Sequence, residues 1–123
     1  MNTPKIDLFS DTKTRPSKPM LQAMIAAETG DEQAGEDPTT IELQERVAQL
    51  LGKEEALFVP SGTMCNQISI AIQCQAGDEI IADKTAHIIN FEAGAAAVIA
   101  RAMIRPLEGQ RGQFSLDQAR EAI

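Results

Sequence analysis

The fold of this chain is decided by the stretch Phe58-Val59-Pro60-Ser61-Gly62-Thr63-Met64-Cys65-Asn66-Gln67. The apolar residues 56–59 predict a short strand, and residues 64–75 predict a helix directly after Ser61-Gly62-Thr63. Glycine lets a ligand approach the backbone closely, and the free amides and positive dipole at a helix start attract an anion. The stretch therefore predicts a phosphate site, while an ordinary capped helix remains open because serine and threonine are common N-caps.

Other helices are predicted from capping residues and from apolar positions at helical spacing. The best defined begins at the capping box Thr39-x-x-Glu42 and ends before Gly52, which suits the left-handed position after a helix. The predictions are a helix over 18–27 after Ser17, with Pro19 in its first turn; the helix after Thr39, with Leu43, Val47, Leu50 and Leu51 on one face; a small helix over 90–97; and a last helix after the capping box Ser115-x-x-Gln118.

Two more apolar runs, 79–82 and 101–107, predict strands that alternate with these helices. Turns are expected at Gly77-Asp78 and over 108–113, and a polar loop after the second strand contains His87, the one histidine of the chain. Strands that alternate with helices indicate an α/β fold with a parallel sheet. Residues 4–16 are expected to form an extended polar arm.

Composition excludes several classes of function. The net charge of -7 disfavours nucleic acid and anionic membranes as partners, and no apolar run is long enough to predict a membrane span. Cys65 and Cys74 are expected to be reduced, small buried hydrophobes of a cytoplasmic protein. One histidine and two separated cysteines do not form a metal site, so no metal is predicted.

Ordered motifs along the whole chain resemble the N-terminal part of L-threonine aldolases, in the aromatic amino acid β-eliminating lyase/threonine aldolase family of pyridoxal phosphate (PLP) fold type I enzymes. The motifs are Asp7–Pro16, Gly30-Asp31, Gly35–Thr39, Leu50–Glu54, Ala56–Met64, Gly77–Glu79, His87-Ile88 and Glu92–Gly94. The resemblance implies that residues 1–123 are a partial, incomplete fold type I large domain with a parallel sheet and helices.

The resemblance also implies a function in threonine catabolism and glycine biosynthesis. PLP would supply the electron sink for retro-aldol cleavage of L-threonine or L-allo-threonine to glycine and an aldehyde. Ser61, Gly62 and Thr63 would hold the PLP phosphate, His87 would lie against the pyridine ring near the substrate hydroxyl, and Ser10 would help to bind the substrate carboxylate. The loop Gly35–Pro38 would lie near the active site at a subunit interface of a homo-oligomer, a tetramer in complete family members.

Each of these roles has a structural alternative. His87 could be an ordinary loop histidine, Ser10 could bond the backbone of its own turn, and the acidic loop could be a solvated turn. Three positions depart from the family pattern, with Phe9 where the family often has arginine, Ala34 where it has an aromatic residue and Phe91 where it has tyrosine. These departures affect substrate recognition more than cofactor binding.

No lysine of this chain stands in the family's Schiff-base lysine motif, so the 123 residues are expected to be inactive alone. The alternative is a non-catalytic protein that binds phosphate or PLP weakly, or that assembles with intact aldolase subunits. A nucleotide-binding P-loop is disfavoured because Ser61-Gly62-Thr63 is not followed by a lysine.

Overall fold

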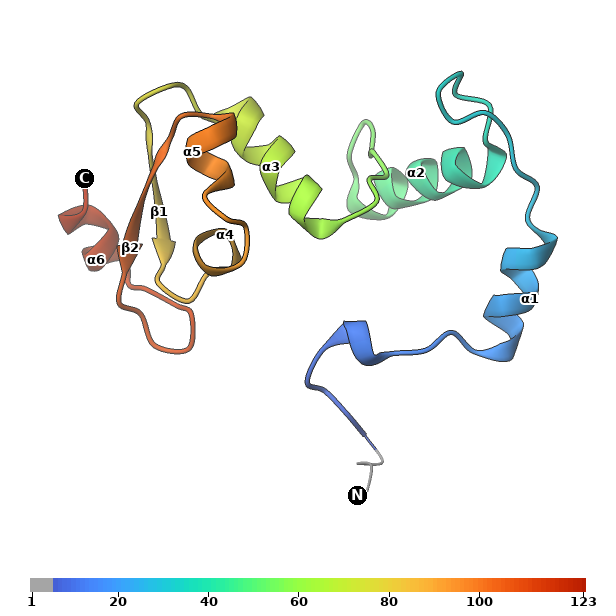
Figure 1. Ribbon diagram of the computed structural model, residues 1–123, viewed down its shortest axis with the longest axis horizontal. Coiled ribbons are helices and arrows are strands. Elements are labelled where there is room, and N and C mark those ends of the chain that lie inside the picture. The colour runs from blue at the N-terminus through green and yellow to red at the C-terminus, as the bar shows by residue number, and fades with distance from the viewer. Residues whose placement is uncertain (1–5) are drawn as a thin grey trace. The chain divides into compact units, whose positions relative to one another are not determined.

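A computed structural model describes residues 6–123 (Figure 1). The chain divides into two compact units, Met1–Phe58, which is described from residue 6 onward, and Val59–Ile123. Residues 4 and 5 of the predicted arm lie outside the described residues. That residues 1–123 belong to one partial domain stays a prediction.

The described part of the first unit contains helices joined by irregular segments. The 3₁₀ turn η1 spans Asp11–Lys13, helix α1 spans Lys18–Ala26 and helix α2 spans Pro38–Leu51. The predicted cap of α1 is confirmed, because the Ser17 hydroxyl accepts a hydrogen bond from the Met20 amide at 3.4 Å. Gly52 also ends α2 as predicted, with φ +62°.

The predicted start of α2 at Thr39 is wrong, because Asp37 is the N-cap and Pro38 is the first helical residue. Asp37 accepts hydrogen bonds from the amides of Thr40 (2.8 Å) and Gly30 (3.0 Å), and these bonds hold its pKa below the usual range. Aspartate caps helices better than threonine, and proline suits the first helical position. Thr39 donates its hydroxyl to the Glu28 carbonyl instead.

The second unit is an α/β arrangement with two parallel strands. Its elements in chain order are α3 (Gly62–Gln73), β1 (Glu79–Asp83), α4 (His87–Asn90), α5 (Ala95–Ile99), β2 (Met103–Leu107) and α6 (Leu116–Glu121). Strands β1 and β2 pair in register from Glu79 opposite Met103 to Asp83 opposite Leu107, with α4 and α5 in the connection between them. The predicted α/β class and the parallel pairing are therefore confirmed.

The predicted strand over 56–59 is wrong. A strand needs a neighbouring ladder, and in the described part of the chain this segment has none. Its backbone is bonded by a side chain instead, since the Phe58 amide donates to Gln44 Oε1 on α2 at 2.8 Å. An apolar run alone does not supply that pairing partner.

The predicted helix over 90–97 is also wrong. Two short helices, α4 and α5, are separated by a break in which Ala93 (φ +49°) and Gly94 (φ +75°) have left-handed backbone. His87 is the first residue of α4 and does not lie in a polar loop. The break buries Glu92, whose side chain is only 1% exposed.

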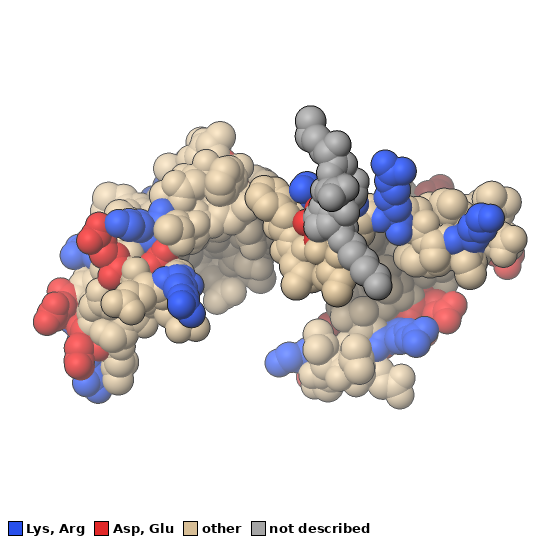
Figure 2. Space-filling model, turned by 90° about the horizontal axis from the view of Figure 1, so that it is seen from below, with Lys and Arg blue, Asp and Glu red and all other residues tan. Residues whose placement is uncertain are grey.

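Among residues 6–123, the buried apolar residues are all alanines. Helix α3 packs on α5, and α5 packs on β2. Small side chains allow this close approach, while many large apolar side chains, such as Leu8 (92%) and Ile25 (86%), stay exposed. The face in Figure 2 shows Lys and Arg interspersed with Asp and Glu, with broad uncharged areas between them. The buried alanines are Ala48, Ala82, Ala95, Ala96, Ala100, Ala102 and Ala122.

Candidate active site

The first turn of α3 presents a set of hydrogen-bond donors. Ser61 is the N-cap, and its hydroxyl oxygen accepts from the Met64 amide at 3.2 Å. Gly62 and Thr63 follow as the first two helical residues, whose amides have no partner inside a helix. A methyl group added to Gly62 would meet nothing within 4 Å, so the space beside this amide is open.

His87 is connected to α3 through the buried Glu92. His87 Nδ1 lies 2.8 Å from Glu92 Oε1, and the Asn66 amide nitrogen donates to the same oxygen at 2.7 Å. Asn66 lies on α3, one turn beyond the donors at its start. The imidazole is half exposed and packs beside the Phe91 ring at 5.3 Å between centroids.

Glu92 has the character of a buried carboxylate held by donors. Hydrogen bonds from Asn66 and His87 hold its pKa below the usual range against the effect of desolvation. An ionised carboxylate only accepts hydrogen bonds, so it pairs with the form of the His87 ring that carries a proton on Nδ1. The other carboxylate oxygen, Oε2, is buried and has no partner within residues 6–123.

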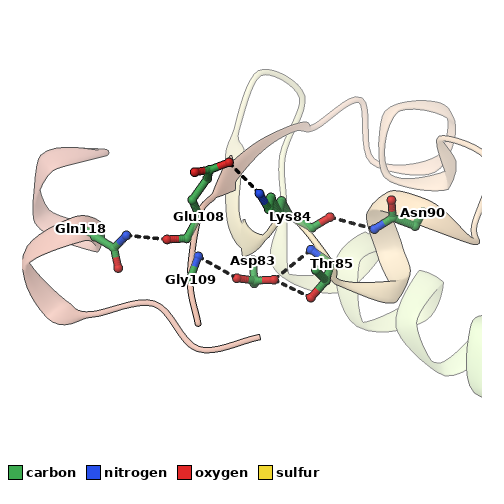
Figure 3. Close-up of polar contacts among 7 residues, drawn as sticks. All are labelled: Asp83, Lys84, Thr85, Asn90, Glu108, Gly109 and Gln118. Atoms are coloured by element: carbon green, nitrogen blue, oxygen red, sulfur yellow. Dashed lines mark hydrogen bonds and ion pairs between the residues drawn. The ribbon is translucent and has the colours of Figure 1, made fainter. Parts of the chain in front are cut away.

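The loop that leads to His87 is fixed by a second polar cluster at the carboxyl ends of β1 and β2 (Figure 3). Asp83 accepts from Thr85 through both its amide and its hydroxyl, and from the Gly109 amide at 3.0 Å. These bonds lower the pKa of Asp83. The cluster joins the loop after β1 to the loop after β2, so the chain enters α4 from a defined position.

Three further interactions extend this cluster. Lys84 forms an ion pair with Glu108 at 2.6 Å, which raises the pKa of Lys84 and lowers that of Glu108. Asn90 donates to the Lys84 carbonyl, and Gln118 on α6 donates to the Glu108 carbonyl (Figure 3). Lys84 is the one lysine of residues 59–123, and its ion pair opposes the neutral amine that a covalent role requires.

The structure brings Ser61, Gly62, Thr63 and His87 into one unit and places Ser10 in the other. Ser10 caps η1, since its hydroxyl accepts from the Thr12 amide at 3.3 Å. This is the local bond that competes with a substrate-binding role, and that role stays a prediction.

Other sequence expectations have mixed outcomes. Both cysteines are free, but Cys65 is exposed, contrary to the expectation of a small buried hydrophobe. Among the described residues, no three metal-ligating side chains form a cluster, and no helix is both long and apolar enough to span a membrane. The loop that contains Gly35 caps α2 through Asp37.

The residues at the start of α3 fit a phosphate group. Two adjacent helix-start amides, two hydroxyls and open space beside a glycine are the donor set that phosphate oxygens require. The Ser61 hydroxyl can cap the helix through its oxygen and still donate its proton. These residues account for the binding of a phosphate group only, and the ring of a cofactor would be bound by other residues.

Sequence reasoning assigned no role to Glu92 or Asn66. Glu92 was part of a motif, but its partners lie five and 26 residues away, and Asn66 reads as an ordinary helical residue. The one signal was the combination of an acidic residue with the small Ala93-Gly94 pair, which permits the break that buries it.

A family model described as beta-eliminating lyase matches residues 7–123. The chain is 46% identical over 114 residues to the low specificity L-threonine aldolase of Escherichia coli (strain K12), which covers 92% of this chain and 34% of the relative. It is 41% identical over 120 residues to low-specificity L-threonine aldolase 1 of Arabidopsis thaliana, covering 96% and 34%.

A relative with another reaction in its name is also similar. Alanine racemase TOXG of Cochliobolus carbonum is 35% identical over 111 residues, which cover 89% of this chain and 28% of the relative. The chain spans about a third of the length of the curated relatives that it matches.

Proposed function

Because this chain belongs to the beta-eliminating lyase family, we propose that it contributes to a PLP-dependent lyase that cleaves a small β-hydroxy amino acid. The proposed substrates are L-threonine and L-allo-threonine, and the products are glycine and an aldehyde. The names of the two relatives that share 41% and 46% identity support this reaction over racemisation.

The observation that carries the proposal is the donor set at the start of α3, with His87 linked to the same helix. Ser61, Gly62 and Thr63 would bind the cofactor phosphate through amides and hydroxyls. His87 would accept or position the proton of the substrate hydroxyl at its free nitrogen. When bound, PLP supplies the electron sink that stabilises the carbanion left by Cα–Cβ cleavage.

Specificity and assembly are further parts of the proposal. Ser10 would contact the substrate carboxylate, and the Gly35–Pro38 loop would approach the site in a cytoplasmic homo-oligomer. Phe91 lies beside His87 and offers no hydroxyl, so the ring wall of the pocket would be apolar. An apolar wall favours substrates by shape, and it distinguishes weakly between two diastereomers of one amino acid.

Residues 1–123 by themselves are proposed to bind PLP reversibly without turnover. Lys84 is ion-paired, and no lysine of this chain stands in the family's covalent motif. Borohydride reduction of the PLP-treated chain should give no specific adduct by mass spectrometry, beyond that obtained with pyridoxal lacking the phosphate. A specific single-site adduct would contradict this part of the proposal.

The test of the reaction is a chimera in which the matched segment replaces that of the Escherichia coli relative. We expect it to bind PLP and to release acetaldehyde from L-threonine, measured with a coupled dehydrogenase. A matched chimera with Ser61→Asp should fold but lose PLP, because the new carboxylate repels the phosphate. A folded, PLP-loaded chimera that racemises alanine and leaves threonine intact would refute the proposed reaction.

A further inference from the structure

The contact between His87 and Glu92 differs from a surface ion pair. The Glu92 side chain is 1% exposed, whereas the His87 ring is 56% exposed and half in solvent. The buried Glu92 carboxylate is therefore the group that can set the orientation of the exposed His87 ring. A residue with a purely local role would bond only to neighbouring backbone. The Glu92 carboxylate instead bonds to Asn66 on α3, 26 residues away, and to His87 on α4.

We propose that Glu92 is the positioning residue of His87, and that its carboxylate holds the imidazole as the Nδ1–H tautomer with Nε2 as the free, proton-accepting nitrogen. Nδ1 lies 2.8 Å from Glu92 Oε1, and no hydrogen bond within residues 6–123 uses Nε2. A base whose second nitrogen is held by an acceptor has a fixed tautomer and ring orientation.

Asn66 is the third member of this hydrogen-bonded group. Its amide donates to the oxygen that His87 contacts, at 2.7 Å, so Glu92 Oε1 is held from α3 and from α4 at once. Asn66 lies on the helix whose first turn carries the phosphate donors. The helix that would bind the cofactor phosphate therefore also helps to orient His87. A catalytic base must be held in a defined position relative to the reacting group, and this arrangement meets that requirement.

The assignment can be measured directly because the chain has one histidine. With ¹⁵N-labelled histidine, long-range ¹H–¹⁵N correlation distinguishes a protonated ring nitrogen from an unprotonated one. We expect Nδ1 protonated and Nε2 unprotonated in the neutral ring of the unaltered chain. Solid-state ¹⁵N spectra give the same shifts if the chain associates. A predominant Nε2–H tautomer would overturn the proposal without any variant.

Variants then identify Glu92 as the cause. Glu92→Gln replaces an obligatory acceptor with an amide that pairs with either tautomer, so the Nδ1–H fraction should fall. Glu92→Asp keeps the carboxylate and should restore part of the preference. Glu79→Gln, which removes a carboxylate of the same unit that is paired with Arg105, should leave the tautomer unchanged. An unchanged tautomer in Glu92→Gln would exclude Glu92 as the positioning group.

The consequence for catalysis rests on the proposed function and is tested in the chimera described above. A general base contributes roughly 10²–10⁴-fold to turnover, and Glu92→Gln should lower kcat within that range with little change in KM. In a His87→Ala background the same change should have no additional effect, because Glu92 acts through His87. An additive loss would refute that pathway.

Failure of the two ideas gives different results. A chimera without threonine cleavage, but with the expected tautomer in the 123-residue chain, would refute the proposed function and leave the Glu92–His87 device intact. An active chimera, together with no preference between the two His87 tautomers in the 123-residue chain, would support the proposed function and refute the role of Glu92.

Discussion

Replacing Ser61 by alanine or by aspartate separates helix capping from anion binding at the start of α3. The hydroxyl accepts from the Met64 amide at 3.2 Å, and loss of such a cap costs about 1 kcal/mol. This corresponds to roughly 4 °C in Tm for a chain of this size. Aspartate caps as well as serine does, so Ser61→Asp should leave the free energy of unfolding unchanged or slightly raised.

Anion affinity should behave differently in the two variants. Ser61→Ala removes one donor, and a hydrogen bond to a charged group contributes roughly 1.5–3 kcal/mol; at this exposed position we expect the lower end of that range, about tenfold in affinity. Ser61→Asp adds a charge beside the phosphate, and two unit charges about 4 Å apart repel by roughly 4 kcal/mol at an effective dielectric constant of 20. Solvent screening at this exposed position reduces that figure, so we expect a loss of at least about tenfold.

Two serines of the same chain provide matched controls. Ser17 caps α1 and Ser115 caps α6 with the same geometry, at 3.4 Å and 3.2 Å from the amides that they accept. Ser17→Ala and Ser115→Ala should each lower stability by about 1 kcal/mol and leave phosphate affinity unchanged.

The assays follow from the composition. The chain has no tryptophan or tyrosine, so unfolding in urea is followed by far-UV circular dichroism, and phosphate binding by calorimetric titration with inorganic phosphate and with PLP. If all three alanine variants lose equal stability and Ser61→Asp binds phosphate as the unaltered chain does, the start of α3 is an ordinary capped helix and our reasoning is refuted.

Three other outcomes are expected. Gly109→Ala should destabilise the second unit by about 1–3 kcal/mol in urea unfolding, because the new methyl would overlap the Gln113 carbonyl; wild-type stability would contradict this close contact. His87→Ala in the chimera should lower kcat while PLP stays bound, seen in its absorption spectrum, and unchanged kinetics would identify an ordinary histidine. The Lys84–Glu108 pair should stabilise the fold between two pH limits, because its contribution is lost as pH falls through the lowered Glu108 pKa or rises through the raised Lys84 pKa. When the free energy of unfolding is measured against pH, Glu108→Gln should reduce both the acidic and the alkaline loss of stability. An unchanged pH dependence would exclude a stabilising pair.

Features with local causes could be predicted from the sequence. The caps at Ser17, Ser61 and Ser115 depend on one hydroxyl and an amide three residues later, and all three form in the structure. Strands β1 and β2 were also predicted, because their apolar runs are bounded by turns. The proposed phosphate donors are local in the same way, and their role stays a prediction.

Features that depend on distant partners could not be predicted. The run over 56–59 has strand composition, but its backbone is bonded by a side chain of α2. The break between α4 and α5 interrupts a sequence rich in helix formers. It has left-handed backbone at Ala93 and Gly94, and Glu92 beside it is hydrogen-bonded to the distant Asn66. Nothing in the spacing of His87 and Glu92 indicates a third residue 26 positions away.

A core made of alanines has thermodynamic consequences. Each buried methyl removes little apolar surface from water, and apolar surface determines the heat capacity change of unfolding and much of its sensitivity to denaturant. The second unit should therefore have a flat stability curve and a shallow urea dependence for its size. Directional polar bonds, such as those of Asp83 and Glu92, fix geometry without burying much apolar surface, so we expect them to carry a larger share of its stability.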